Sequence, residues 1–111
     1  MNPCPLKEYL LCIQRLVPLG DGELERAFGD WMAGDERARR LIEEQHLSRV
    51  VAWVLPYRGQ GIAFMALIEA GNRALLKALR RHPDLRLAGF EDHLRTAVEE
   101  SVESLLMARR P

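Results

Sequence analysis

The residues best able to do chemistry in this chain of 111 residues are three histidines, several adjacent carboxylates and a run of basic residues. His46, His82 and His93 are scattered, and none has a second histidine or a cysteine at metal-ligand spacing. The acidic pair Glu43-Glu44 occupies neighbouring helix positions, which point in different directions. No glycine-rich phosphate loop and no nucleophile motif occur. We therefore expect no catalysis, no metal and no cofactor.

The basic run is better suited to binding. Arg73, Lys77 and Arg80 are spaced i, i+4 and i+7, which places them on one face of a helix. This stripe could bind phosphates or an acidic helix, or it could be a solvated face. Arg58 adds a cation in the turn from Tyr57 to Gly61, but no aromatic residues interleave with the stripe, and acidic and basic residues balance at 16 each. We expect DNA binding to be weak or absent.

Apolar residues recur at helical spacing throughout the chain and never alternate as in a strand. The pattern predicts an all-α bundle of about five helices. Asp21 and Asp35 are good N-caps, and Pro56 should kink a helix or end it early. The predicted helices run from about Pro5 to Val17, Asp21 to Gly34, Asp35 to Leu55, Ile62 to Arg81 and Phe90 to Leu106.

The fourth predicted helix and the turn before it organise the rest. Gly59 and Gly61 permit an abrupt chain reversal, because glycine adopts backbone angles that other residues avoid. The pair Gly71-Asn72 should interrupt the helix, since both residues disfavour helix interiors. The residues expected on its buried side are Met65, Ile68, Asn72, Leu75, Leu76 and Leu79.

Several motifs here resemble bacterial sigma factors of the sigma-70 class. Tyr57 to Gly61 resembles the family's Y-R-G-x-G, and Leu67 to Ala78 is similar to L-I-Q-E-G-N followed by G-L-M-R-A, at unchanged spacing. Ala33 to Glu43 is similar to A-G-D-x-x-A-R-x-x-L-I-E, and Pro5 to Leu10 resembles the opening of region 1.2. The resemblance implies a single domain over residues 1–111, with region 1.2-like helices over about 1–34 and region 2-like helices over 35–111.

The last helix departs from that family. The helix that melts the promoter −10 element in sigma factors falls on Phe90 to Val102, and only Phe90 is kept among its aromatic residues. Unpaired bases are captured by stacking on aromatic rings, with cations on the phosphates. Five acidic residues and one arginine occur between Phe90 and Leu106, so this surface should repel a phosphate backbone. We expect no promoter melting.

The fourth helix corresponds to the one with which sigma factors bind the clamp helices of the largest subunit of RNA polymerase core. Ala66, Glu69 and Ala70 replace polar residues of the family motif, whereas Asn72 is kept. Asn72 could therefore serve docking, or it could be satisfied by an internal hydrogen bond. The polymerase-binding residues implied are Glu69, Asn72, Arg73, Leu76 and Arg80; Arg58 and Lys77 could contact nucleic acid or an acidic partner.

Our leading hypothesis is a sigma-factor-like transcription regulator that binds polymerase core without melting promoters. The alternative is a degenerate sigma-like interaction module that binds another regulator or itself, without polymerase or DNA contact. We expect a cytoplasmic protein, because no apolar run approaches the roughly 20 residues of a membrane span and no signal pattern occurs. Cys4 and Cys12, eight residues apart on one predicted helix, should stay reduced.

Overall fold

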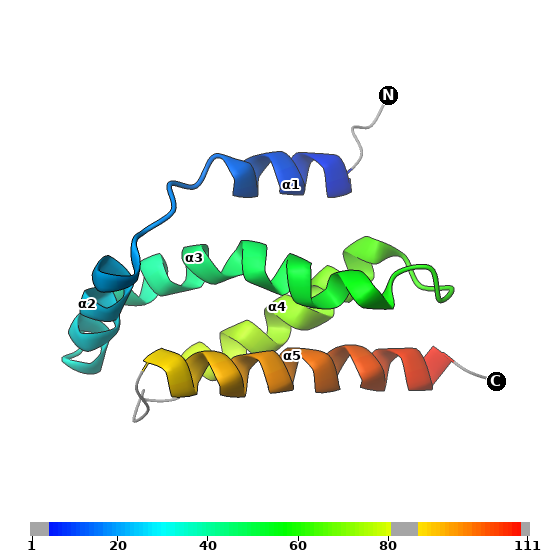
Figure 1. The fold of residues 1–111 in the computed structure, drawn as a ribbon. Coiled ribbons are helices and arrows are strands. Elements are labelled where there is room, and N and C mark those ends of the chain that lie inside the picture. The colour runs from blue at the N-terminus through cyan, green and yellow to red at the C-terminus, as the bar shows by residue number, and fades with distance from the viewer. Residues whose placement is uncertain (1–4, 81–86, 110–111) are drawn as a thin grey trace.

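The computed structural model describes residues 5–80 and 87–109, so Cys4 and His82 lie outside the described residues. Within these ranges the chain forms five α-helices, one short 3-10 helix and no strand, which confirms the all-α prediction (Figure 1). The elements are α1 (Pro5–Gln14), α2 (Asp21–Met32), α3 (Glu36–Val54), η1 (Leu55–Tyr57), α4 (Phe64–Arg80) and α5 (Leu87–Arg109).

The three longest helices, α3, α4 and α5, pack against one another and form the body of the domain (Figure 1). α2 packs against α3 at one end of this body, and α1 lies across α3 and α4. None of the helices in the described part of the chain has the length and apolar character needed to cross a membrane.

Local chemistry explains the ends of α3. The carboxylate of Asp35 accepts a hydrogen bond of 2.8 Å from the backbone N–H of Arg37, as predicted for an N-cap. At its other end α3 passes into η1, whose first residues include Pro56, so the predicted early end is confirmed. Gly59 and Gly61 in the following turn have φ values of 82° and 88°, which confirms that this reversal uses glycine conformations.

α1 ends earlier than the sequence pattern predicts. It stops at Gln14 and not at Val17. The segment after it is held by the side chain of Gln45 on α3, whose Nε2 donates to the carbonyl of Val17 (2.8 Å) and whose Oε1 accepts from the N–H of Leu19 (2.9 Å). These two bonds satisfy a carbonyl and an N–H that lie beyond the last turn of α1, next to Pro18, which has no N–H with which to continue the helix.

Three helix starts also differ, and the first is that of α5, which begins at Leu87, three residues before the predicted Phe90. The N-cap of α2 is Gly20, in an extended conformation, and the predicted cap Asp21 is already the first helical residue. α4 begins at Phe64, two residues after Ile62, because the carbonyl of Ala63 accepts its first backbone hydrogen bonds. Ile62 instead belongs to the turn and packs into the core.

The predicted interruption of α4 is wrong, because the helix runs without a break through Gly71 and Asn72. Gly71 has a packing role instead. A Cβ atom at this position would lie 2.6 Å from Cγ1 of Val50 and 3.3 Å from Cγ1 of both Val54 and Val98. The absence of a side chain therefore allows α4 to approach α3 and α5 closely.

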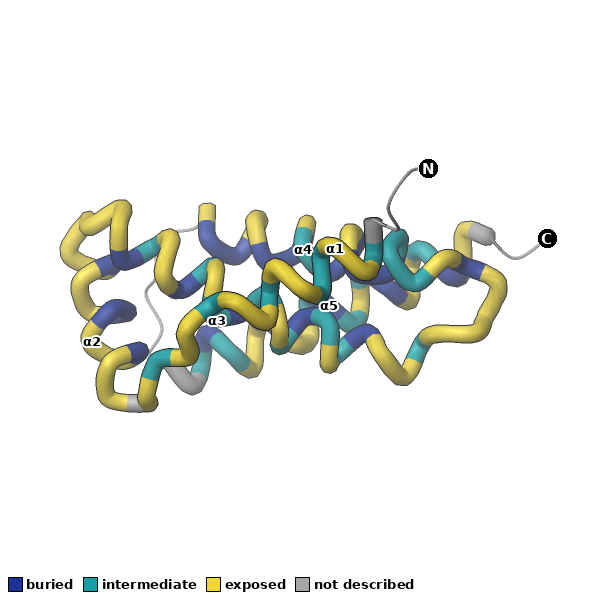
Figure 2. The backbone as a smooth tube through the Cα atoms, turned by 90° about the horizontal axis from the view of Figure 1, so that it is seen from above, coloured by how far each residue is buried: buried dark blue, intermediate teal, exposed yellow. Residues whose placement is uncertain are grey.

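The core runs along the inner faces of all three long helices (Figure 2). Where α2 joins the body, the rings of Phe28, Trp31 and Phe90 pack with their centres 5.4 to 5.6 Å apart. The ring of His46 meets Phe90 edge-on at 5.7 Å. This aromatic cluster of four residues joins α2, α3 and α5.

Candidate functional site

The predicted binding residues of α4 form two adjacent rows along its outer side. One row contains Glu69, Arg73 and Lys77, and the other contains Asn72, Leu76 and Arg80, each at a spacing of four residues. Together these six residues are called the α4 strip. All are exposed except Asn72, which is half-buried. The structure thus brings together five of the predicted polymerase-binding residues, with Lys77 beside them.

The first row borders α5. A groove of about 480 Å³ lies along the seam between the two helices; Arg73 and Lys77 line it from α4, and His93 and Glu100 line it from α5. The two basic residues of α4 therefore share this groove with a histidine and an acidic residue of α5. The exposed positions of Arg73 and Lys77 agree with the predicted basic stripe.

The second row borders α3. Leu76 and Arg80 line a furrow between α3 and α4, of about 450 Å³, whose other wall carries Glu36, Arg39 and Glu43. Arg39 forms ion pairs with Glu36 at 2.8 Å and with Glu43 at 3.4 Å, so the positive charge on that wall is already paired within α3. The furrow offers an apolar floor with charged groups on both sides.

Leu76 corrects one prediction. It was expected on the buried side of α4, but 41% of its surface is exposed. Leu75 and Leu79 occupy the core-facing positions, and each residue along an α-helix is rotated by about 100° from the one before. Leu76 therefore turns outward beside the core and becomes the one large apolar residue of the α4 strip.

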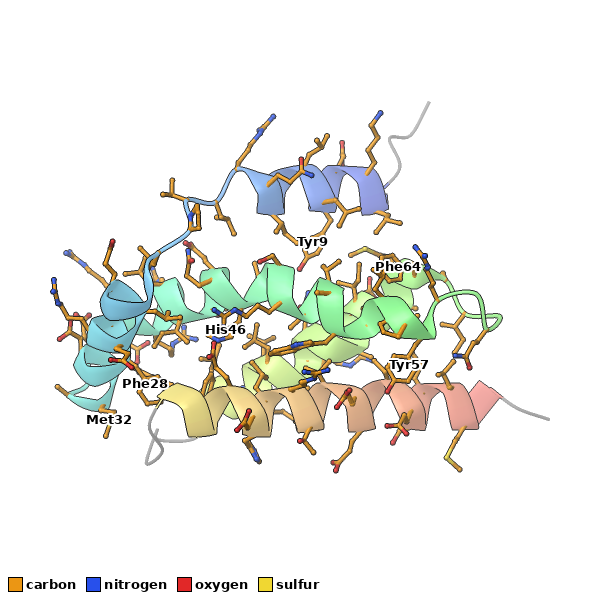
Figure 3. The ribbon with its side chains drawn as sticks, in the orientation of Figure 1. Tyr9, Phe28, Met32, His46, Tyr57 and Phe64 are labelled. Atoms are coloured by element: carbon orange, nitrogen blue, oxygen red, sulfur yellow. The ribbon has the colours of Figure 1, made fainter. Side chains whose placement is uncertain are left out.

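Asn72 is engaged within the molecule. Its Nδ2 donates a hydrogen bond of 2.8 Å to the hydroxyl oxygen of Tyr9, which projects from α1 toward α3 and α4 (Figure 3). Its Oδ1 is buried and has no hydrogen-bond partner in the described part of the chain. Burial raises the pKa of Tyr9, while the bond from Asn72 acts in the opposite direction. An internal hydrogen bond, one of the two alternatives for Asn72, is therefore present.

The three positions at which this chain replaces polar residues of the sigma-factor motif differ in exposure. Ala70 is only 1% exposed, and its carbonyl accepts a hydrogen bond of 3.0 Å from the hydroxyl of Ser101 on α5. A partner cannot reach this position without separating the two helices. Ala66 is half-buried, whereas Glu69 is exposed, so Glu69 is the replaced position that remains open to a partner.

Arg58 is not part of the α4 strip. It is exposed in the turn before α4, at the opposite end of that helix from Arg80. The 17 residues of α4 place its two ends about 24 Å apart at the usual rise per residue. One compact ligand could not contact both residues.

A buried polar cluster was missed by the sequence reasoning. His46 is 0% exposed; its Nδ1 lies 2.7 Å from the carbonyl oxygen of Ile42, and its Nε2 lies 2.7 Å from Oε2 of Glu91 on α5. Arg49 forms an ion pair with the same carboxylate. Burial lowers the pKa of His46, the hydrogen bond to Ile42 raises it, and nearby Arg49 lowers it further.

A signal for this cluster was present in the sequence. The buried side of α3 repeats every four residues, and His46 occupies the middle of that series. Position alone thus indicated burial, although the partner on α5, 45 residues away, left no local pattern. The series is Ala38, Ile42, His46, Val50 and Val54.

The surface of α5 carries few groups suited to nucleic acid. Phe90, the retained aromatic residue, is only 4% exposed because it belongs to the aromatic cluster. His93 and Thr96 are exposed, as are the acidic residues Asp92 and Glu100. Capture of unpaired bases would require an accessible ring, and Phe90 cannot provide one in this packing.

Sequence comparison with known proteins supports the resemblance described above. No protein-family model matches the chain. RNA polymerase sigma factor SigA of a Bacillus species is 42% identical over 79 residues, and SigA of Clostridium acetobutylicum is 36% identical over 78 residues; each match covers 69% of this chain and 20% of the relative. RNA polymerase sigma factor RpoS of Coxiella burnetii is 31% identical over 74 residues, 67% of this chain and 21% of the relative. The chain therefore spans about a fifth of the length of these proteins. The resemblance seen in the sequence is confirmed: over about two thirds of its length, this all-α chain is a homologue of the RNA polymerase sigma factors.

Proposed function

We propose that this protein is a transcription regulator that binds RNA polymerase core through the α4 strip and does not melt promoters. The observation that carries the proposal is the exposed face formed by Glu69, Arg73, Leu76 and Arg80 on a helix whose other side is core. A single rigid helix thus presents an apolar anchor between charges of both signs. Such an arrangement suits a helical partner.

The partner surface can be described from the strip. Arg73, Lys77 and Arg80 require acidic groups opposite the C-terminal half of α4, and Glu69 requires a donor or a cation nearer its N-terminus. Leu76 requires a small apolar contact between them. We propose the clamp helices of the largest polymerase subunit as this partner, because SigA and RpoS, whose names specify RNA polymerase, are homologues of this chain.

The absence of promoter melting rests on α5. The burial of Phe90 and the acidic residues exposed on α5 support a protein that contributes polymerase contact alone. In this role it would occupy the sigma site or modulate a resident sigma factor in the cytoplasm.

The test is co-elution of the purified chain with polymerase core that lacks a sigma factor. The wild-type chain should be retained at micromolar concentration and displaced by a SigA-type sigma factor. The double variant Arg73→Glu and Arg80→Glu should bind at least about tenfold more weakly, because two interfacial charges are reversed.

The matched control is Arg26→Glu with Arg95→Glu, which makes the same change in net charge on the exposed faces of α2 and α5. Circular dichroism should show both variants folded. Equal weakening by both pairs would mean that overall charge, and not the α4 strip, determines binding. No retention of the wild-type chain would refute the polymerase contact and leave the alternative, an interaction module for another regulator or for itself.

A further inference from the structure

We propose that α1 is a hinged cover over one end of the furrow between α3 and α4, and that a docking partner displaces it. The inference rests on the proposed function, because it describes how access to the α4 strip is controlled. Three features carry it: a weak attachment of α1, a separate anchor behind it, and a buried polar atom left without a partner.

The attachment of α1 is small. Leu6 and Tyr9 are its half-buried residues that pack against the core, and among the described residues its side-chain hydrogen bond to the body joins Tyr9 to Asn72. On its outer side Leu11 is 45% exposed and Cys12 is also exposed. A helix of ten residues with so little buried surface is marginal by itself and opens at low free-energy cost.

The anchor lies beyond the end of α1. Gln45 holds the backbone of Val17 and Leu19 through two hydrogen bonds, of 2.8 and 2.9 Å. The two residues between Gln14 and Val17 make turn bonds to the end of α1, from Arg15 to Cys12 and from Leu16 to Ile13, so a change of conformation there leaves both bonds of Gln45 intact. The chain is therefore fixed by Gln45 and attached again through Tyr9 (Figure 3), which is the arrangement of a hinge with a releasable contact.

The closed position leaves a polar group unsatisfied. Oδ1 of Asn72, the residue whose Nδ2 donates to Tyr9 on α1, is buried without a hydrogen-bond partner in the described residues. A buried acceptor without a partner destabilises the arrangement that buries it. When α1 moves away, water or a donor from the partner can reach this oxygen, so displacement removes that penalty.

The position of α1 determines what it blocks. Asn72 begins the row that continues through Leu76 to Arg80, and this row borders the open furrow against Glu43 on α3. α1 covers the Asn72 end of that row. A partner helix that follows the whole row must therefore take the place of α1, whereas one that binds only the row of Glu69, Arg73 and Lys77 need not.

Hydrogen exchange on the full chain tests the cover without any partner. Tyr9→Phe removes the hydroxyl and keeps the ring, so the backbone amides of α1 should exchange about five- to tenfold faster, while those of α3 to α5 are unchanged. Tyr57→Phe is the matched control, because its hydroxyl lies near Glu103 on α5 and not near α1. If the amides of α1 exchange only at the rate of those in α3 to α5, α1 opens only when the whole domain unfolds, and the inference is overturned.

Binding to polymerase core provides the second measurement. A partner that binds only the open form has an affinity proportional to the open fraction, so Tyr9→Phe should bind tighter by the same factor by which α1 exchange rises. Amides of α1 should lose protection in the complex. Unchanged affinity, or α1 still protected in the complex, would overturn the cover. If neither protein binds, the proposed function fails, and exchange in the free chain still decides whether α1 opens separately.

Discussion

Replacing Gly71 by alanine should destabilise the domain although alanine is the better helix former. In a helix interior, alanine is favoured over glycine by about 1 kcal/mol. Against this, the new Cβ would stand 2.6 Å from Cγ1 of Val50 and 3.3 Å from Cγ1 of Val54 and of Val98. All three valines are fully buried and have little room to move. Overpacking of a core costs typically about 1–3 kcal/mol, and three constrained neighbours place this site near the upper end.

The net loss expected for Gly71→Ala is therefore about 2 kcal/mol in the free energy of unfolding. For a domain of this size that corresponds to a fall in Tm of roughly 8–16 °C. Urea unfolding followed by circular dichroism at 222 nm measures the loss directly. A stability equal to or above that of the wild-type chain would refute the claim that close packing, and not helix flexibility, requires glycine here.

A matched substitution and a second variant separate the two effects. A Cβ added at Gly29 on α2 would have no neighbouring atom within 4 Å, so Gly29→Ala should stabilise by about 0.5–1 kcal/mol. Val50→Ala removes the nearest obstructing methyl group. In that background Gly71→Ala should be much less destabilising, and a double-mutant cycle should give a coupling energy above about 1 kcal/mol.

Two further predictions concern the cap of α3 and its buried histidine. Asp35→Ala should lower the free energy of unfolding by about 1 kcal/mol, because the N–H of Arg37 loses its acceptor; a loss below about 0.3 kcal/mol in urea unfolding would contradict this. The pKa of His46 is lowered from 6.5, chiefly by burial, so the unfolded chain binds this proton first and stability should fall as the pH drops below about 6.5, levelling off below the pKa of the folded state. Urea unfolding of His46→Phe should show a smaller loss in the free energy of unfolding between pH 7.5 and 5.5 than the wild-type chain shows. Equal losses in the two proteins would contradict the assignment of this pH dependence to His46.

The features that the sequence predicted correctly are those set by local chemistry. Helical spacing, the cap at Asp35, the stop at Pro56 and the glycines of the turn each depend on residues close together in the chain. The outward face of α4 followed from the same spacing, since Arg73 and Arg80 could not lie on the core side.

The features that were missed depend on contacts between distant residues. Asn72 meets Tyr9 from 63 positions away, and His46 meets Glu91 from 45 positions away. Gly71 was interpreted as a break because its local propensity is poor, whereas its role is set by valines on α3 and α5. Periodicity assigns a residue to a face of its helix, but it does not identify the helix that packs there.

The aromatic cluster has a consequence for the order in which the domain is built. Phe28 and Trp31 lie early in the chain. Phe90, whose ring packs against both of theirs, is synthesised some sixty residues later. During synthesis α2 therefore has apolar rings without their final neighbour until α5 has left the ribosome. A nascent chain stalled before Phe90 should expose these rings to chaperones, and the emergence of α5 should bring Phe90 to them and complete the cluster.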